Sequence, residues 1–155
     1  MTGVSANEFA PEQKTTRAET WSMLARLEGV ESAESAGFAD VAANDWYATA
    51  VNWAASVGIT SGTGDGNFSP NTAITREQLA AMLMNYAAWK GEDVSARADL
   101  SSYNDAASVS SWAAETVQWA VAEGLISGIP GNLLEPQGSA TRAQVAAILE
   151  RFLEQ

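Results

Sequence analysis

Two residue types that carry much of protein chemistry are missing from this chain. Its 155 residues include no Cys and no His. The absence of Cys excludes disulfide bonds and thiolate chemistry. The absence of His removes the commonest general base, the usual zinc ligand and the Ser-His relay. A chain without cysteine fits an exported protein and fits many cytosolic ones too. We expect no cofactor and no metal.

Basic residues are also scarce, since eight Lys and Arg stand against 19 Asp and Glu, and the net charge is -11. This balance argues against a nucleic-acid partner that is bound through a basic surface. No segment approaches the roughly 20 apolar residues that cross a bilayer, so we expect no membrane span. The opening MTGVSANEF lacks the features of a signal peptide. An exported form would therefore be a mature fragment that has lost its signal.

What the chain does contain is apolar residues, at 46% of the total. This content indicates a globular chain rather than a disordered one. The length is enough for one domain with its own core.

Three short stretches share one pattern: TRAE at 16–19, TREQ at 75–78 and TRAQ at 141–144. Thr followed three residues later by Glu or Gln is a capping box, which marks a helix start. The Arg is not explained in this way, because a cation in the first turn faces the positive end of the helix dipole at a cost of about 0.3–1 kcal/mol. We therefore treat Arg17, Arg76 and Arg142 as candidates for a function.

The pattern belongs to a longer repeat. Residues 46–86 align with 112–152 without a gap, and an earlier copy matches only in its second half. We predict a single module, 1–155, with a partial first copy at 1–29 and full copies at 38–88 and 99–155. Repeats of this length indicate one supersecondary unit used several times. Identical pairs in the two full copies include Trp46/Trp112, Trp53/Trp119, Gly58/Gly124, Pro70/Pro136 and Arg76/Arg142.

Each full copy reads as helix, loop, helix, so the predicted fold class is all-α. Apolar residues at helical spacing predict a first helix over about 45–57 and 111–123. Gly58 and Gly124 follow these segments, in the position where a helix commonly finishes on glycine. The second helix begins at the capping box. We expect Phe68 and Leu134 to anchor the intervening loops in the core.

The pattern F-x-D-V, W, A-V-x-W-A, G-I-x-x-G, F-x-P and I-T-R-E resembles the S-layer homology (SLH) domain. The resemblance implies helix–loop–helix repeats packed as a pseudo-threefold, three-pronged bundle. It also implies non-covalent anchoring of exported bacterial proteins to the cell wall, hence an extracellular location. The usual partner is a peptidoglycan-linked secondary cell wall polysaccharide, often capped by a pyruvate ketal. The site residues that the resemblance implies are Arg17, Arg76, Arg142, Trp46, Trp112, Asp40, Asp105, Gly58 and Gly124.

A pyruvate ketal on the polysaccharide would explain the Arg in the first turn of each of these helices. Its carboxylate can be gripped by a planar guanidinium through two hydrogen bonds, and free N–H groups at a helix start favour the same anion. The alternative to ligand binding is an ion pair at the protein surface. In both cases the Arg would contribute little to the stability of the fold. Asp40 and Asp105 either bind ligand or support turns. Trp46 and Trp112, at helix starts, are candidates for ligand contact or packing, whereas Trp53 and Trp119 are expected in the core.

Two other classes of function compete with wall binding. An enzyme of the glycosidase type needs two suitably spaced carboxylates, yet Glu19 is replaced by Gln78 and Gln144 in the later copies. This exchange keeps capping and abolishes acid–base chemistry, so we expect no catalysis. The acidic turn GDGN at 64–67 does not recur in register, so a tight turn explains it better than calcium does. A protein-interaction or self-assembly module of a surface layer, without glycan binding, remains the alternative.

The first copy starts within its loop, because Met1 aligns with Thr60. Its first helix is absent, so at most two complete grooves are expected within this chain. A homo-oligomer or a longer parent chain would supply the missing helix.

Overall fold

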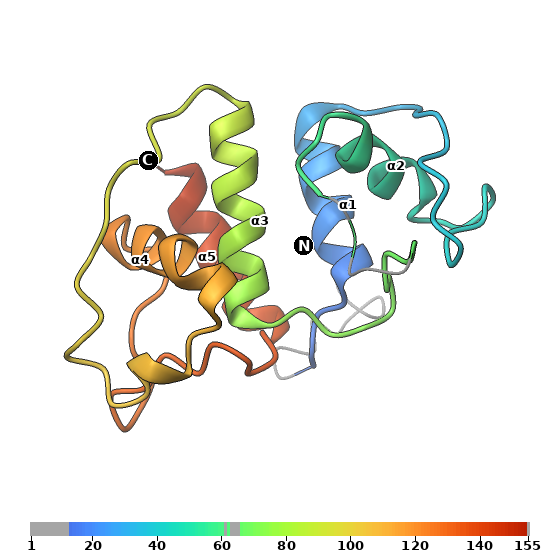
Figure 1. Cartoon of the computed structure of the whole chain (residues 1–155). Helices are drawn as coiled ribbons and strands as arrows, with labels where there is room; N and C mark the ends of the chain where they lie inside the picture. The colour runs from blue at the N-terminus through green and yellow to red at the C-terminus, as the bar shows by residue number, and fades with distance from the viewer. Residues whose placement is uncertain (1–12, 61, 63–65, 155) are drawn as a thin grey trace. The chain divides into compact units, whose positions relative to one another are not determined.

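The computed structural model describes residues 13–60, 62 and 66–154, in which helices are joined by long loops (Figure 1). The described residues contain no strand, and only isolated bridges join loop segments. The predicted all-α class is therefore confirmed. The elements are α1 (Arg17–Glu28), α2 (Ala48–Ser56), α3 (Arg76–Trp89), the 3₁₀ turns η1 (Ala106–Ser108) and η2 (Ser111–Ala113), α4 (Ala114–Ala122) and α5 (Arg142–Leu153).

The helices fall into two compact units, and each unit mixes two copies of the repeat. The first unit is Thr15–Ile74, in which α1 packs against α2. The second contains the described residues from Thr75 onward together with Gln13 and Lys14, and there α3 packs against α4 and η2. The second helix of one copy thus pairs with the first helix of the next. The copy boundaries and the pseudo-threefold arrangement stay predictions, and residues 1–12 of the first copy lie outside the described residues.

All three predicted capping boxes are present. Thr16, Thr75 and Thr141 are the N-caps of α1, α3 and α5, and each hydroxyl accepts from the backbone N–H three residues on at 3.1 Å. In return, the Glu or Gln at that position accepts from the backbone N–H of the Thr at 3.0 Å. Each box satisfies two donors that a helix start would otherwise leave open.

The remaining N–H groups of the first turn are occupied by the loop of the next copy. In α1, the N–H groups of Arg17 and Ala18 donate to the carbonyls of Thr72 and Pro70, both at 2.9 Å. In α3, Arg76 and Glu77 donate in the same way to Gly138 and Pro136, again at 2.9 Å. The expectation that these helix starts offer free N–H groups to an anion is therefore wrong for α1 and α3, because the loop has taken them.

The first helices end as predicted but start later. Gly58 (φ 80°) and Gly124 (φ 73°) adopt the left-handed conformation just after α2 and α4. The N–H of the next residue then reaches back to the carbonyl of Ala54 or Ala120, which is a common way of closing a helix. The starts lie at Ala48 and Ala114, so Trp46 precedes α2 and Trp112 lies in η2.

The core contains the side chains that the repeat placed there. Trp53 and Trp119 are buried, at 8% and 2% exposed, and so are the loop anchors Phe68 and Leu134, at 0% and 1%. In the second unit, Tyr86 of α3 meets Phe152 of α5 with ring centroids 5.8 Å apart. Each loop is thereby tied to the helices that it connects. Within the described part of the chain, the helices are too short or too polar for any of them to cross a bilayer.

We predict that Thr75→Ala lowers the free energy of unfolding by about 0.5–2 kcal/mol, because the N-terminal donors of α3 lose their acceptor. Urea unfolding at neutral pH measures the loss. Thr75→Ser keeps the hydroxyl and should retain most of the stability. An alanine variant as stable as the parent would contradict the role of the box.

Candidate functional site

The three repeated arginines are buried. Arg17, Arg76 and Arg142 are only 6%, 5% and 3% exposed. The expectation that these arginines lie at the surface is therefore wrong, and burial favours a larger contribution to stability than a surface ion pair makes. For Arg17 and Arg76, the first-turn position that made them unusual in sequence brings the guanidinium to a loop, whose carbonyl groups accept its hydrogen bonds in place of water.

Arg17 in the first unit and Arg76 in the second donate to the carbonyl at the equivalent position of the loop. The Nε–H of Arg17 donates to the carbonyl of Phe68 at 3.1 Å, and its guanidinium carbon lies 4.8 Å from the centre of the Phe68 ring. The Nε–H of Arg76 donates to the carbonyl of Leu134 at 2.7 Å, and its Nη2 donates to the carbonyl of Ser127 at 3.2 Å. Buried hydrogen bonds from a charged donor are worth more than neutral ones.

Asp40 and Asp105 bind the backbone N–H groups at that loop position, whereas the arginines bind its carbonyl. The carboxylate of Asp40 accepts from the N–H groups of Phe68 and Ser69, both at 2.8 Å. Asp105 accepts in the same way from Leu134 and Glu135, also at 2.8 Å. The second residue of each pair has positive φ, 61° at Ser69 and 46° at Glu135, which is uncommon for a side chain other than glycine. We infer that the aspartates fix the loop conformation. This agrees with the expectation, offered as an alternative to ligand binding, that they support turns.

The charges in each pair influence each other's pKa. Partial burial lowers the pKa of Arg17 and Arg76 from the ordinary value, opposed by Asp40 in the first case and by Glu135 and Asp105 in the second. Desolvation tends to raise the pKa of Asp40 and Asp105. Their two backbone hydrogen bonds and the neighbouring Arg outweigh it, so the pKa of both carboxyls lies below 3.8. Both aspartates are thus held ionised at neutral pH.

Trp46 and Trp112 lie on the surface, at 65% and 59% exposed. The ring of Trp46 meets the edge of Tyr47 with centroids 5.2 Å apart. Large aromatic side chains at the start of a helix usually contribute to packing, and these two leave most of their area in water. Exposed indole rings suit contact with a ligand, a role that stays a prediction.

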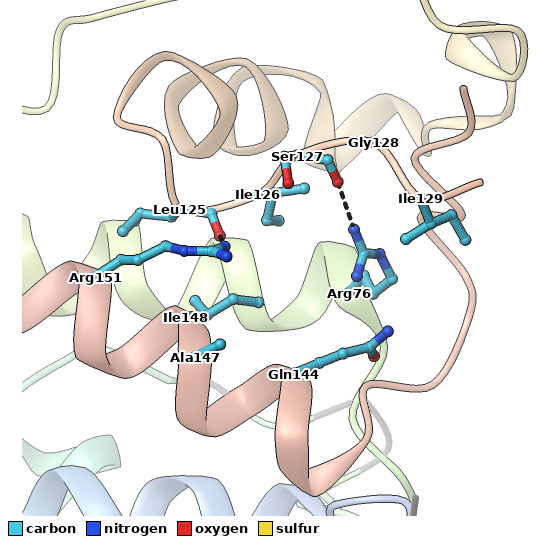
Figure 2. Close-up of a pocket in the computed structure, with 10 residues that line it drawn as sticks. All are labelled: Arg76, Leu125, Ile126, Ser127, Gly128, Ile129, Gln144, Ala147, Ile148 and Arg151. Atoms are coloured by element: carbon cyan, nitrogen blue, oxygen red, sulfur yellow. Dashed lines mark hydrogen bonds between the residues drawn. The ribbon is translucent and has the colours of Figure 1, made fainter. Parts of the chain in front are cut away.

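A pocket of about 140 Å³ opens in the second unit between α5 and the loop after α4 (Figure 2). Of the site residues expected from the sequence, Arg76 lines it, whereas Trp112, Asp105 and Gly124 are not among its lining residues. Sequence reasoning missed Gln144, which was assigned to capping alone, and Arg151. The lining residues are Arg76, Leu125, Ile126, Ser127, Gly128, Ile129, Gln144, Ala147, Ile148 and Arg151.

The remaining predicted residues have structural positions of their own. Gly58 and Gly124 have open space where a side chain would start, so the positive φ of the helix end is what requires glycine. The N–H of Arg142 donates to the carbonyl of Gln13 at 2.8 Å. Ligand contact by these residues stays a prediction. Among the described residues, no group of three acidic side chains is placed to hold a metal ion.

Fold and site together define a helical repeat module with an arginine-lined pocket. Residues 37–80 and 102–146 match the S-layer homology domain. These two matches cover more than half of the chain, so the chain belongs to the S-layer homology family. The resemblance read from the repeats is confirmed.

The relatives that match nearly the whole chain are much longer proteins, and this chain covers only part of each. The Exoglucanase XynX of Acetivibrio thermocellus is 38% identical over 98% of this chain, which spans 14% of that protein. The Surface-layer 125 kDa protein of Lysinibacillus sphaericus is 31% identical over 98%, and 13% of it is covered. The Cellulosome-anchoring protein of Acetivibrio thermocellus is 30% identical over 99%, and 35% of it is covered. These names agree with the family expected at bacterial surfaces, and the shared segment is a small part of the named enzyme.

We predict that Arg76→Ala lowers the free energy of unfolding by about 1.5–3 kcal/mol, because two carbonyl groups lose a charged donor. Thermal or urea unfolding measures the loss. Arg97→Ala is the matched control, because Arg97 also donates to two carbonyl groups and pairs with Glu115 at 3.8 Å. These contacts are exposed to water, where an ion pair is worth about 0–1 kcal/mol. Equal stabilities of the two variants would contradict the structural role of Arg76.

The aspartates predict a dependence of stability on pH. Their folded pKa is lowered, so their contribution is complete above the unfolded pKa, near 3.8, and is lost as the pH falls through the lower folded value. We expect Asp105→Ala to melt below the parent at pH 7, and the difference in Tm to shrink below about pH 4. A difference that stays constant down to pH 2 would show that the charge of Asp105 is not what supports the loop.

Proposed function

We propose that this chain is a non-covalent cell-wall anchoring module of the bacterial surface. Its partner would be a peptidoglycan-linked secondary cell wall polysaccharide, recognised through the carboxylate of a pyruvylated sugar. The observation that carries the proposal is the pocket that Arg76 lines in the second unit. Family membership supports it, as do relatives named for cell-surface or cellulosome-anchoring roles.

The pocket has the chemistry that a pyruvate ketal requires. The guanidinium of Arg76 is fixed in place by its bonds to Leu134 and Ser127, so little side-chain freedom would be lost on binding. A fixed planar guanidinium suits a carboxylate. Apolar side chains line both sides of the pocket, Ile126 and Ile129 from the loop and Ile148 from α5, and would suit the methyl group of the ketal. In a chain of net charge -11, this local placement is what would attract an anion.

The exposed indoles would extend the binding surface along the polymer. Trp46 and Trp112 present their rings to solvent at the starts of the first helices. The apolar face of a sugar ring can stack on such a ring. Arg17 and Asp40 hold the loop of the first unit with the same contacts.

The site is built for binding rather than for catalysis. Each oxygen of Asp40 and Asp105 already accepts a backbone N–H, so neither carboxylate is presented as a general acid or base. Relatives named as enzymes share only a small fraction of their length with this chain. We therefore propose no enzymatic activity for it.

We predict that Trp112→Ala weakens binding to cell walls by about tenfold and leaves the melting temperature nearly unchanged, because the ring is exposed and packs little. Co-sedimentation with isolated walls measures the binding, and walls stripped of their secondary polymer are the control. Trp119→Ala, which removes a buried indole, should instead unfold the chain at a lower temperature. Equal retention by intact and stripped walls would favour the self-assembly alternative.

A further inference from the structure

Gln144, which belongs to the capping box of α5, also lines the pocket. It is half-buried, and its Oε1 accepts from the backbone N–H of Thr141 at 3.0 Å. The capping box makes no use of the amide nitrogen of the side chain. Figure 2 shows Gln144 extending from α5 toward Arg76. A residue that completes a helix start is therefore also one that a ligand in the pocket would meet.

The capping box determines the orientation of the amide. A backbone N–H donates to an oxygen and not to an amide nitrogen, so Oε1 of Gln144 must face Thr141 and Nε2 must face away from it. Within the described part of the chain, no residue accepts from Nε2. In Figure 2 the amide nitrogen lies on the side of Gln144 that faces Arg76. Gln144 therefore offers hydrogen-bond donors to the pocket.

Arg76 offers the same pocket more donors than its own contacts use. Its Nε and Nη2 donate to the carbonyls of Leu134 and Ser127, and a guanidinium carries further N–H groups on Nη1 and Nη2. None of the ten lining residues drawn in Figure 2 is acidic. Two sets of donors thus line one pocket whose lining residues supply no carboxylate. An anionic acceptor from a ligand could receive hydrogen bonds from both.

The first copy of the repeat shows that the helix start does not require an amide at this position. It has Glu19 in the equivalent place, and the box of α1 has the same distances, 3.0 and 3.1 Å. The two residue types differ in what they would bring to the pocket. Glu would place a negative charge and acceptors where Gln144 places donors. It would repel an anion and compete with it for Arg76.

We propose that Gln144 is a ligand-binding residue that determines the specificity of the pocket, because its amide donates to the same sugar carboxylate that Arg76 binds. The oxygen of the side chain then completes the start of α5, and the nitrogen selects an anion. This inference rests on the proposed function and adds a residue to its site.

Calorimetric titration with two synthetic sugars tests the inference. One is pyruvylated N-acetylmannosamine, and the other is the same sugar with the carboxylate of the ketal converted to a neutral carboxamide. We expect the parent chain to bind the carboxylate about tenfold more tightly, the size of one hydrogen bond to a charged group. Gln144→Glu should bring that ratio close to one. Its melting temperature should not fall, because Glu19 completes the same box in α1 and a carboxylate suits the first turn of a helix.

Gln78→Glu is the matched control. It makes the same exchange in the capping box of α3, and Gln78 is not among the residues that line the pocket. The two variants have the same net charge. The control should keep the preference of the parent chain for the carboxylate. A preference that both variants lose to the same extent would assign the effect to net charge and overturn the role of Gln144.

The outcomes separate the two proposals. A Gln144→Glu variant that keeps the ratio of the parent chain overturns the role of Gln144 and leaves the wall-binding proposal intact. A variant that loses affinity for both sugars by the same factor shows a purely structural residue, which also overturns the inference. Failure of the parent chain to bind either sugar overturns the proposed function, and this inference with it.

Discussion

The structure depends on one loop residue in each unit, Phe68 or Leu134, whose backbone N–H and carbonyl both form hydrogen bonds to charged side chains. In each unit an aspartate accepts the N–H groups at Phe68 or Leu134 and at the following residue, and a buried arginine donates to the carbonyl of the first. Carbonyl groups slightly further along then accept the first N–H groups of α1 or α3. The loop is thereby fixed at a conformation with positive φ, and the helix start is completed by a different copy of the repeat. One set of polar contacts thus links two copies.

This arrangement explains why each compact unit combines parts of two consecutive copies of the repeat. A copy on its own would leave two N–H groups in the first turn of its second helix without acceptors and its apolar side chains without a partner, which is costly for both kinds of group. Pairing α1 with α2, and α3 with α4, satisfies both requirements between consecutive copies. Repeat proteins commonly gain their stability from such interfaces between neighbours.

The structural role of Arg76 is compatible with the binding role that we propose for it. Holding Leu134 and Ser127 fixes the guanidinium of Arg76, and a fixed guanidinium is a better receptor for a planar anion than a mobile one. Burial also removes competing water, which strengthens interactions with charge. A residue that supports the loop can therefore be the residue that a ligand meets.

The sequence by itself determined the helices, the starts of α1, α3 and α5, and the buried aromatic residues. Capping boxes at Thr16, Thr75 and Thr141, and glycines after α2 and α4, act within one or two turns, so local chemistry specifies them. Only the tertiary structure decided the position of the arginines, because their burial depends on carbonyl groups 51 and 58 residues further along the chain. The same holds for Gln144, which the sequence predicted only as part of a capping box, and for Arg151, which no sequence motif pointed to. Their place in the pocket follows from packing α5 beside the loop after α4, and no local pattern encodes that contact.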